Sequence, residues 1–119
     1  MASHAPELVL SPCRAEEEQA RRLMAWRNHP ASLANSFHPE PKTWPAFWDE
    51  YRRVYLDPAL PPPVWVLQAG RPVAFLRFRP VAHPAGVDRR CCDISIIVAP
   101  ERQGQGLGPA ALAAAAGYL

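Results

Sequence analysis

Three glycines within five residues separate an apolar, β-branched run from a run of alanines near the end of this 119-residue chain. Residues 94–98 read ISIIV, Gly104, Gly106 and Gly108 follow, and every residue from 110 to 116 except Leu112 is alanine. β-Branched residues favour strands, glycine permits tight turns, and alanine has the highest helix propensity. The segment therefore predicts a strand, a glycine-rich turn and a helix in direct succession.

The predicted turn has the properties of an anion-binding site. The first backbone N–H groups of a helix have no partner within the helix, and the helix dipole adds positive potential at the same end. Glycine lets a ligand approach the backbone without obstruction by a Cβ atom. The turn lacks the Gly-Lys-Ser/Thr ending of a nucleoside-triphosphate loop, and its G-x-G-x-G spacing differs from the dinucleotide fingerprint G-x-G-x-x-G. We therefore expect a phosphate-bearing ligand of another kind, with a ligand-free helix-entry turn as the alternative.

The alanine helix is expected to lie close against a sheet, because its side chains are small. Pro109 suits the first helical position, where a missing N–H costs little. We expect the inward-facing stripe of this helix to consist of Leu112, Ala116 and Leu119.

Upstream of the turn, helical and strand patterns alternate. We expect a strand at 7–10, an amphipathic helix at 15–28, a second helix capped by Thr43 and ending near Asp57, paired strands at 64–68 and 72–80, a loop at 79–90 and a strand at 91–100. In the last strand, Asp93, Ser95 and Ile97 alternate with Ile94, Ile96 and Val98, so the strand should have two distinct faces. This order predicts one domain over residues 1–119, of the α/β (α+β) class, with a mixed, mostly antiparallel sheet flanked by helices.

Composition excludes several classes of protein. Hydrophobic residues make up 49% of the chain and charged residues 20%, which is typical of a folded globular domain. The formal net charge is only +2 and the arginines are dispersed, so we expect no nucleic-acid partner. No apolar run approaches the ~20 residues of a membrane helix, and no export signal opens the chain, so we expect a cytoplasmic protein without a membrane partner. Three cysteines without CxxC spacing predict no metal site.

The segment ISIIVAPERQGQGLG resembles the coenzyme-binding signature of the GNAT family of N-acetyltransferases, in which an apolar strand ending in V-x-P is followed by Q/R-x-x-G-x-G/A. Gln103, Gly106 and Gly108 match that element in type and spacing. The upstream segments MAWRNHP and SFHPEPKTWPAFWDEY are similar to the branch that contains ribosomal-protein acetyltransferases and acetyltransferases of amino-sugar nucleotides. The resemblance covers nearly the whole chain and implies an acyl-CoA N-acyltransferase fold.

The resemblance also implies roles for particular residues. Acetyl-CoA would be the acetyl donor, with its pyrophosphate on the backbone of Gln103, Gly104, Gln105, Gly106, Leu107 and Gly108, its pantetheine arm along Ile96, Ile97 and Val98, and no metal. Asp93 is the candidate acceptor of the proton from the substrate amine, with a solvated strand aspartate as the alternative. His38, Arg27 and Asn28 are candidate substrate contacts. An exposed loop histidine and an Arg-Asn pair that caps its own helix are the alternatives.

Family members continue past this helix with further strands and a helix, so we expect a fold that lacks its C-terminal strands and ends within an incomplete domain. The leading function is transfer of an acetyl group to a primary amine, such as an amino-sugar nucleotide. A non-catalytic acyl-CoA-binding module and a protein Nα-acetyltransferase of a ribosomal protein are the alternatives. The expected partner is a small-molecule amine, and the interpretation leaves room for a homodimer.

Overall fold

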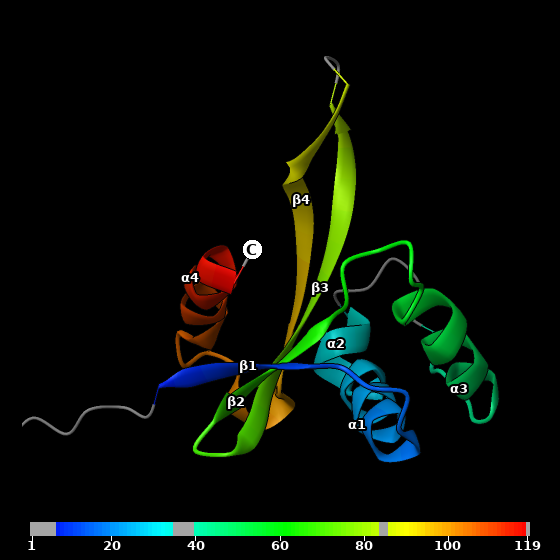
Figure 1. Ribbon diagram of the computed structural model, residues 1–119. Coiled ribbons are helices and arrows are strands. Elements are labelled where there is room, and N and C mark those ends of the chain that lie inside the picture. The colour runs from blue at the N-terminus through cyan, green and yellow to red at the C-terminus, as the bar shows by residue number, and fades with distance from the viewer. Residues whose placement is uncertain (1–6, 35–39, 84–85, 119) are drawn as a thin grey trace, which may run out of the picture.

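A computed structural model describes residues 7–34, 40–83 and 86–118, with backbone alone at 80–83, 86–93 and 117–118. The described elements are β1 (Leu8–Pro12), α1 (Glu17–Asn28), α2 (Pro30–Ala34), α3 (Ala46–Glu50), the π-helix η1 (Tyr51–Tyr55), β2 (Val64–Gln68), β3 (Arg71–His83), β4 (Gly86–Val98), the 3-10 helix η2 (Pro100–Arg102) and α4 (Leu107–Tyr118) (Figure 1). None of the helices in these ranges is long and apolar enough to cross a membrane.

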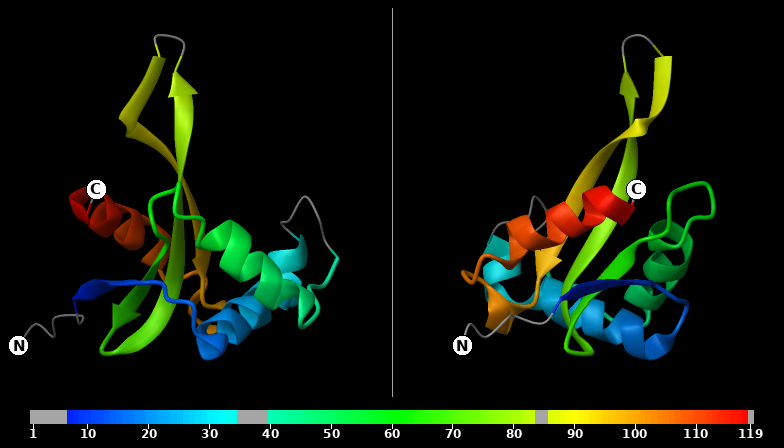
Figure 2. Two further views of the ribbon diagram at one scale, coloured as in Figure 1. Left: turned by 45° about the vertical axis from the view of Figure 1, so that its right-hand side comes forward. Right: turned by 60° about the vertical axis from the view of Figure 1, so that its left-hand side comes forward.

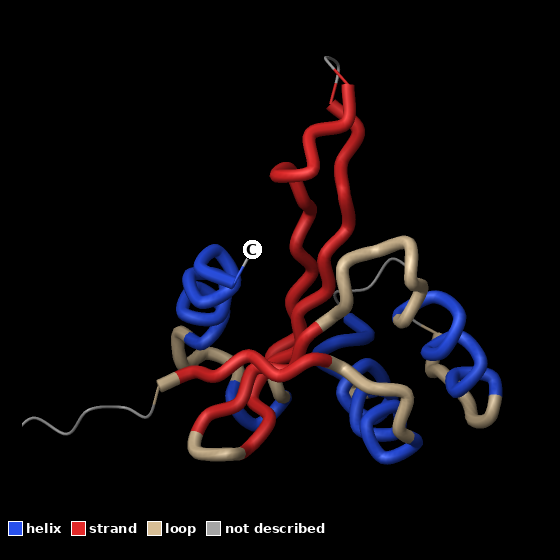
Figure 3. Tube along the Cα trace, viewed as in Figure 1, coloured by secondary structure: helices blue, strands red, loops and turns tan. Residues whose placement is uncertain are grey.

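The described strands form one sheet in the order β1-β2-β3-β4, and all three neighbouring pairs are antiparallel. Helices cover both faces: α4 lies on one side, and α1, α2 and α3 lie on the other (Figures 1 and 2). The distal part of the β3–β4 hairpin projects beyond both helical layers (Figure 3). This is the expected α+β architecture, with β1 and β4 as the outer strands of the described sheet.

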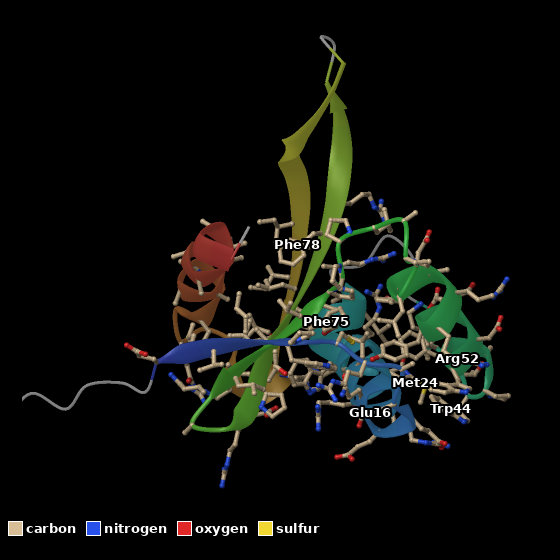
Figure 4. All side chains as sticks on the ribbon, viewed as in Figure 1. Glu16, Met24, Trp44, Arg52, Phe75 and Phe78 are labelled. Carbon is tan, nitrogen blue, oxygen red and sulfur yellow. The ribbon has the colours of Figure 1, made fainter. Side chains whose placement is uncertain are left out.

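The register of β3 against β4 separates the interior into two cores. Phe75 lies opposite Ile97, and Leu76 lies opposite Ile96. Successive side chains of a strand point to opposite faces of the sheet, so the first pair faces α1 and α3 and the second pair faces α4. Figure 4 shows the labelled Phe75 and Phe78 of β3 on opposite sides of the sheet. The expectation that the strand before the glycine turn has two faces is therefore confirmed for its described side chains.

Aromatic side chains dominate the core beneath α1 and α3. Its buried members are Cys13, Ala20, Leu23, Trp26, Phe47, Tyr51, Tyr55, Trp65, Phe75 and Ala99. The second core, beneath α4, is aliphatic apart from Phe78 and contains Val64, Val66, Val73, Ala74, Leu76, Leu107, Ala111 and Ala115 as well. The smaller residues of α4 allow that helix to lie close to the sheet, as expected.

A stack of rings and guanidinium groups joins α1 to α3. The Arg21 guanidinium lies 4.0 Å from the Trp44 ring centroid, Trp44 and Trp48 stack at 5.7 Å, and the Arg52 guanidinium lies 4.7 Å from the Trp48 centroid. Each such contact contributes on the order of 0.5–1.5 kcal/mol, so the stack adds to the buried core rather than replacing it. Trp44 and Trp48 are half-buried against the aromatic core and hold the two helices together.

Several local expectations were wrong. The helix expected from Thr43 starts at Ala46 without a side-chain cap and widens into η1, and the short α2 follows directly on α1. The loop expected at 79–90 is largely strand, because β3 continues to His83 and β4 begins at Gly86. A register shift between Pro80 and Ala82 accommodates the proline within the pairing.

The inward stripe of α4 also differs from the prediction. The helix begins at Leu107, so Pro109 is its third residue, and the buried positions are Leu107, Ala111 and Ala115. Leu112 is 39% exposed and Ala116 is exposed, whereas Leu119 lies outside the described residues. The start at Leu107 and the close approach of the helix to the sheet place alanines, not Leu112, in contact with the strands.

A short polar chain crosses the aromatic core. The Tyr51 hydroxyl donates to the Arg14 carbonyl at 2.5 Å and lies 2.7 Å from Cys13 Sγ, whose backbone N–H donates to the Pro63 carbonyl. Burial raises the pKa of the Cys13 thiol above its ordinary value of 9.0 and raises the pKa of Tyr51 above its ordinary 10.0. Both groups are therefore neutral acids that the folded state keeps protonated.

This burial predicts a loss of stability at alkaline pH. A raised folded-state pKa means that the unfolded chain releases the proton first, so the free energy of unfolding is constant below the unfolded pKa and falls as pH rises past it. We expect the fall to begin near pH 9.0 through Cys13. In Cys13→Ala it should begin about one unit later, where Tyr51 ionises. Urea unfolding followed by tryptophan fluorescence at successive pH values checks this, and identical pH profiles for the two proteins would contradict it.

Candidate functional site

The turn between β4 and α4 owes its shape to two glycines. Gly104 has φ +79° and Gly106 has φ +75°, both in the left-handed region that residues with a Cβ atom rarely adopt. A Cβ atom placed at either glycine would meet nothing within 4 Å. The two glycines are therefore required by backbone conformation and not by packing within the chain.

Gly108 has a different status. It is the second residue of α4, its φ lies outside the left-handed region, and a Cβ atom there would also meet nothing within 4 Å beyond the backbone of its own helix. Alanine at a helical position is more stable than glycine by about 1 kcal/mol, so neither conformation nor packing in the chain favours glycine here. An open surface above a helix N-terminus, formed by glycines, fits close approach of a ligand from outside.

Side chains on either side of the turn hold it in place. The Arg102 guanidinium donates to Gln105 Oε1 at 2.8 Å and to Gln68 Oε1 at the end of β2. Gln103 Nε2 donates to the Val98 carbonyl at 3.4 Å. The sequence alone assigned no role to Arg102. Its contact with Gln68 could not be predicted, because only the fold brings Gln68 beside the turn. The result is a backbone cradle whose outer residues, 103–106, are exposed.

The strand that leads into the turn lies at the edge of the described sheet. Ile96, Ile97 and Val98 pair with Leu76, Phe75 and Ala74 of β3 on one side. β4 is the last strand in the order, so its other edge carries no strand partner among the described residues. The free edge and the cradle follow each other directly along the chain, and an extended ligand could contact both.

The structure describes only some of the expected acceptor-side residues. Asp93 lies in β4 with its backbone opposite Arg79, and its side chain is outside the described set. His38 lies outside the described residues. Asn28 forms two hydrogen bonds with the Lys42 backbone, donating to the carbonyl at 2.8 Å and accepting from the N–H at 2.7 Å. Its amide therefore fastens the end of α1 to the segment before α3, which is a structural role that sequence reasoning did not include.

Arg27 stands beside a cluster that the sequence did not reveal. The Arg77 guanidinium lies 4.3 Å from the Tyr55 ring centroid, and Lys42 Nζ pairs with Glu50 Oε2 at 3.0 Å. Burial lowers the pKa of Arg77 and raises the pKa of Tyr55, and the Arg27 charge acts on both groups. The one sequence signal was the alternation of Arg77 and Arg79 in β3, which places two cations on one face.

A shallow depression of about 400 Å³ lies near this cluster, between the segment before α3 and the helix itself. Its lining includes Glu40, Lys42, Thr43, Phe47 and Glu50. Within the described ranges, no group of three His, Cys, Asp or Glu side chains is arranged to hold a metal ion.

Sequence comparison assigns the family. Residues 21–119 match the acetyltransferase (GNAT) family, and these residues include β2 to β4, the glycine turn and α4. The chain therefore belongs to the GNAT family. A search of curated protein sequences found no match.

Solved structures agree with the fold. AAC(6')-Ib in complex with ribostamycin and coenzyme A matches with a TM-score of 0.65 and 15% identity, over 89% of this chain and 63% of that one. An N-acetyltransferase from Staphylococcus aureus Mu50 matches at 0.60 and 16%, over 87% and 60%. A GNAT family acetyltransferase from Brucella melitensis in complex with acetyl-CoA matches at 0.56 and 17%, over 87% and 62%. The chain thus spans somewhat less than two thirds of each of these relatives.

The two kinds of glycine predict opposite effects on stability. Gly106→Ala forces a Cβ atom into the left-handed region and should lower the free energy of unfolding by about 1–2 kcal/mol. Gly108→Ala should leave it unchanged or raise it by up to about 1 kcal/mol. Urea denaturation of the two variants beside the parent chain measures both values, and a large loss in Gly108→Ala would show that the chain itself requires that glycine.

Proposed function

We propose that this chain carries the coenzyme-binding and acceptor-facing part of an acetyl-CoA-dependent N-acetyltransferase. The observation that carries the proposal is the glycine cradle at the start of α4, directly after a strand with a free edge. Family membership supports acetyl-CoA as the donor.

In this proposal the cradle binds the coenzyme pyrophosphate. The backbone N–H groups from Gln103 to Gly108 are available at the start of α4, where the helix dipole favours negative charge. Pro109 has no N–H and contributes no donor. Absence of Cβ atoms at Gly104, Gly106 and Gly108 leaves room for the phosphate oxygens against the backbone. Acetyl-CoA supplies, when bound, an acetyl group activated as a thioester.

The edge of β4 would hold the pantetheine arm along Ile96, Ile97 and Val98, through those of their backbone groups that point away from β3. A backbone N–H near Ile96 would then polarise the carbonyl that is attacked. Attack requires a neutral amine, because an ammonium ion has no free electron pair. Asp93, three residues before Ile96, would accept the amine proton directly or through water.

The proposed acceptor is a small primary amine, and similarity of the MAWRNHP and SFHPEPK segments to one branch of the family favours an amino-sugar nucleotide. Arg27, Asn28 and His38 are the proposed acceptor contacts. Asn28 retains hydrogen-bonding capacity beyond its two bonds to Lys42, since an amide offers two N–H donors and two acceptor electron pairs.

Measurement of coenzyme A affinity distinguishes a phosphate-binding cradle from a ligand-free turn. Gly108→Val places a branched side chain, larger than the glycine or alanine that the family signature accepts there, where the phosphate would lie, so we expect coenzyme A affinity to fall at least about tenfold while the fold is kept. Ala113→Gly, at an exposed position of the same helix, is the matched control. It should lower stability by about 1 kcal/mol and leave affinity unchanged.

Calorimetric titration of coenzyme A into the three proteins measures these affinities. Equal affinity in the parent chain and Gly108→Val would refute the cradle. Saturable binding without thiol release in the presence of acetyl-CoA and any of a panel of amines would instead support an acyl-CoA-binding module.

The role of Asp93 predicts a pH-dependent defect. If Asp93 accepts the amine proton, Asp93→Asn should lower kcat/KM by about a hundredfold near neutral pH. The defect should shrink as pH approaches the amine pKa, because more of the substrate is then already neutral. Thiol release from acetyl-CoA, followed across pH, checks this. A variant with the parent rate and the parent pH profile would remove Asp93 from the mechanism.

A further inference from the structure

One arginine lies over a tyrosine ring on the sheet face opposite α4, and the charge of a second arginine acts on both. Arg77 extends from β3, and its guanidinium lies 4.3 Å from the centroid of the Tyr55 ring in η1. Arg27, in the last turn of α1, is close enough for its charge to act on both residues. Arg27 and Arg77 are each half-buried, and neither forms an ion pair or a hydrogen bond within the described residues.

Tyr55 gives a second, independent indication of a ligand. The residue is only 4% exposed, yet its hydroxyl has no hydrogen-bond partner in the described part of the chain. No fully buried polar side-chain atom there lacks a partner, so the hydroxyl is the portion of Tyr55 that reaches the surface. An otherwise buried side chain thus presents its single polar group, without a partner among the described residues, on a ring that Arg77 overlies.

One carboxylate whose charge acts on this cluster is shared with a lysine. Glu50 acts on both Arg77 and Tyr55, and it pairs with Lys42 at 3.0 Å. The pKa of Arg77 is lowered chiefly by burial; Tyr55 and Glu50 act to raise it, and the charges of Arg79 and Arg27 act to lower it. Two partly buried cations that share one carboxylate with a lysine are costly to keep charged, and a bound anion would offset that cost.

We propose that Arg27, Arg77 and the Tyr55 hydroxyl form an anion subsite that binds a carboxylate or phosphate group carried by the acceptor amine. The assignment of this anion to the acceptor rests on the proposed function. Guanidinium groups suit either anion, because their planar N–H donors match paired oxygens, and the tyrosine hydroxyl adds one donor.

The position of the subsite fits an acceptor that reaches the thioester. Arg77 lies opposite Ser95, next to Ile96, on the strand adjacent to the proposed pantetheine edge. Neighbouring strands are about 4.8 Å apart, so the anion and the reacting amine would be separated by roughly 5–10 Å. Substrates with an anion several bonds from a primary amine satisfy this spacing.

Matched amines test the subsite in binding experiments that do not require catalysis. The probes are glucosamine 6-phosphate with glucosamine, and 4-aminobutyrate with n-butylamine, each titrated into the 119-residue chain and followed by protein amide shifts. We expect at least one anionic probe to bind about tenfold tighter than its neutral partner, as one charge-assisted contact would give. The two pairs show whether the site prefers phosphate or carboxylate.

Variants assign the preference to the proposed residues. Arg77→Gln should remove the preference, Arg77→Lys should keep part of it, and Tyr55→Phe should weaken it several-fold without loss of fold. Arg52→Gln is the matched control, since it removes an exposed arginine of η1 that also lies over a ring, that of Trp48. If Arg77→Gln fails to fold, Tyr55→Phe and Arg77→Lys still decide the question.

Three results would overturn the inference: equal binding of anionic and neutral amines, no amine binding by the folded parent chain, or an equal loss in Arg52→Gln and Arg77→Gln. Titration of coenzyme A into the same proteins distinguishes failure of the anion subsite from failure of the proposed function. Coenzyme binding without anion preference would remove the subsite alone. Anion preference without coenzyme binding would remove the acetyl-CoA assignment and leave the anion site.

Discussion

Antiparallel pairing of β3 with β4 fixes which side chains face each layer of helices. Phe75 opposite Ile97 and Leu76 opposite Ile96 are neighbouring pairs, yet they belong to different cores. A slip of one residue would exchange the two faces of β4 and bury its polar positions beneath α4. Hydrophobic burial on both faces therefore specifies the register. The register in turn determines which side chains of β4 face each layer of helices.

The same pairing determines the position of the proposed coenzyme site. β4 leads into the glycine turn, so the position of its last residues determines where the N-terminus of α4 points. Ala111 and Ala115 let α4 approach the sheet closely, and Arg102 ties the turn back to Gln68 of β2. On the opposite face, the packing of η1 against β3 brings Arg77 beside the Tyr55 ring. The cradle and the cation cluster are thus placed on two faces of one pair of strands.

Sequence reasoning was reliable where the signal was local. The strand, the glycine turn and the helix are adjacent in the chain, and their residue types leave few other conformations. The stripe of α4 could not be predicted in the same way, because a run of alanines has no hydrophobic contrast to show its phase. Leu112 suggested an inward face by its size alone, and the helix instead buries Leu107 and two alanines.

Contacts between distant segments could not be predicted from the sequence. Asn28 stays a proposed substrate contact, and its pairing with the Lys42 backbone was missed because it depends on how the chain returns after α2. Arg77 and Tyr55 are 22 positions apart, and only the packing of η1 on β3 brings them together. Pro80 suggested a loop, whereas the hairpin tolerates it through a shift in register.

Amide chemical shifts of the folded chain during titration with coenzyme A would test the central claim most directly. The account predicts saturable shifts that are largest at residues 103–108, smaller shifts at 96–98 along the free edge of β4, and little change in β1. A well-dispersed spectrum in which residues 103–108 do not respond to coenzyme A would contradict it.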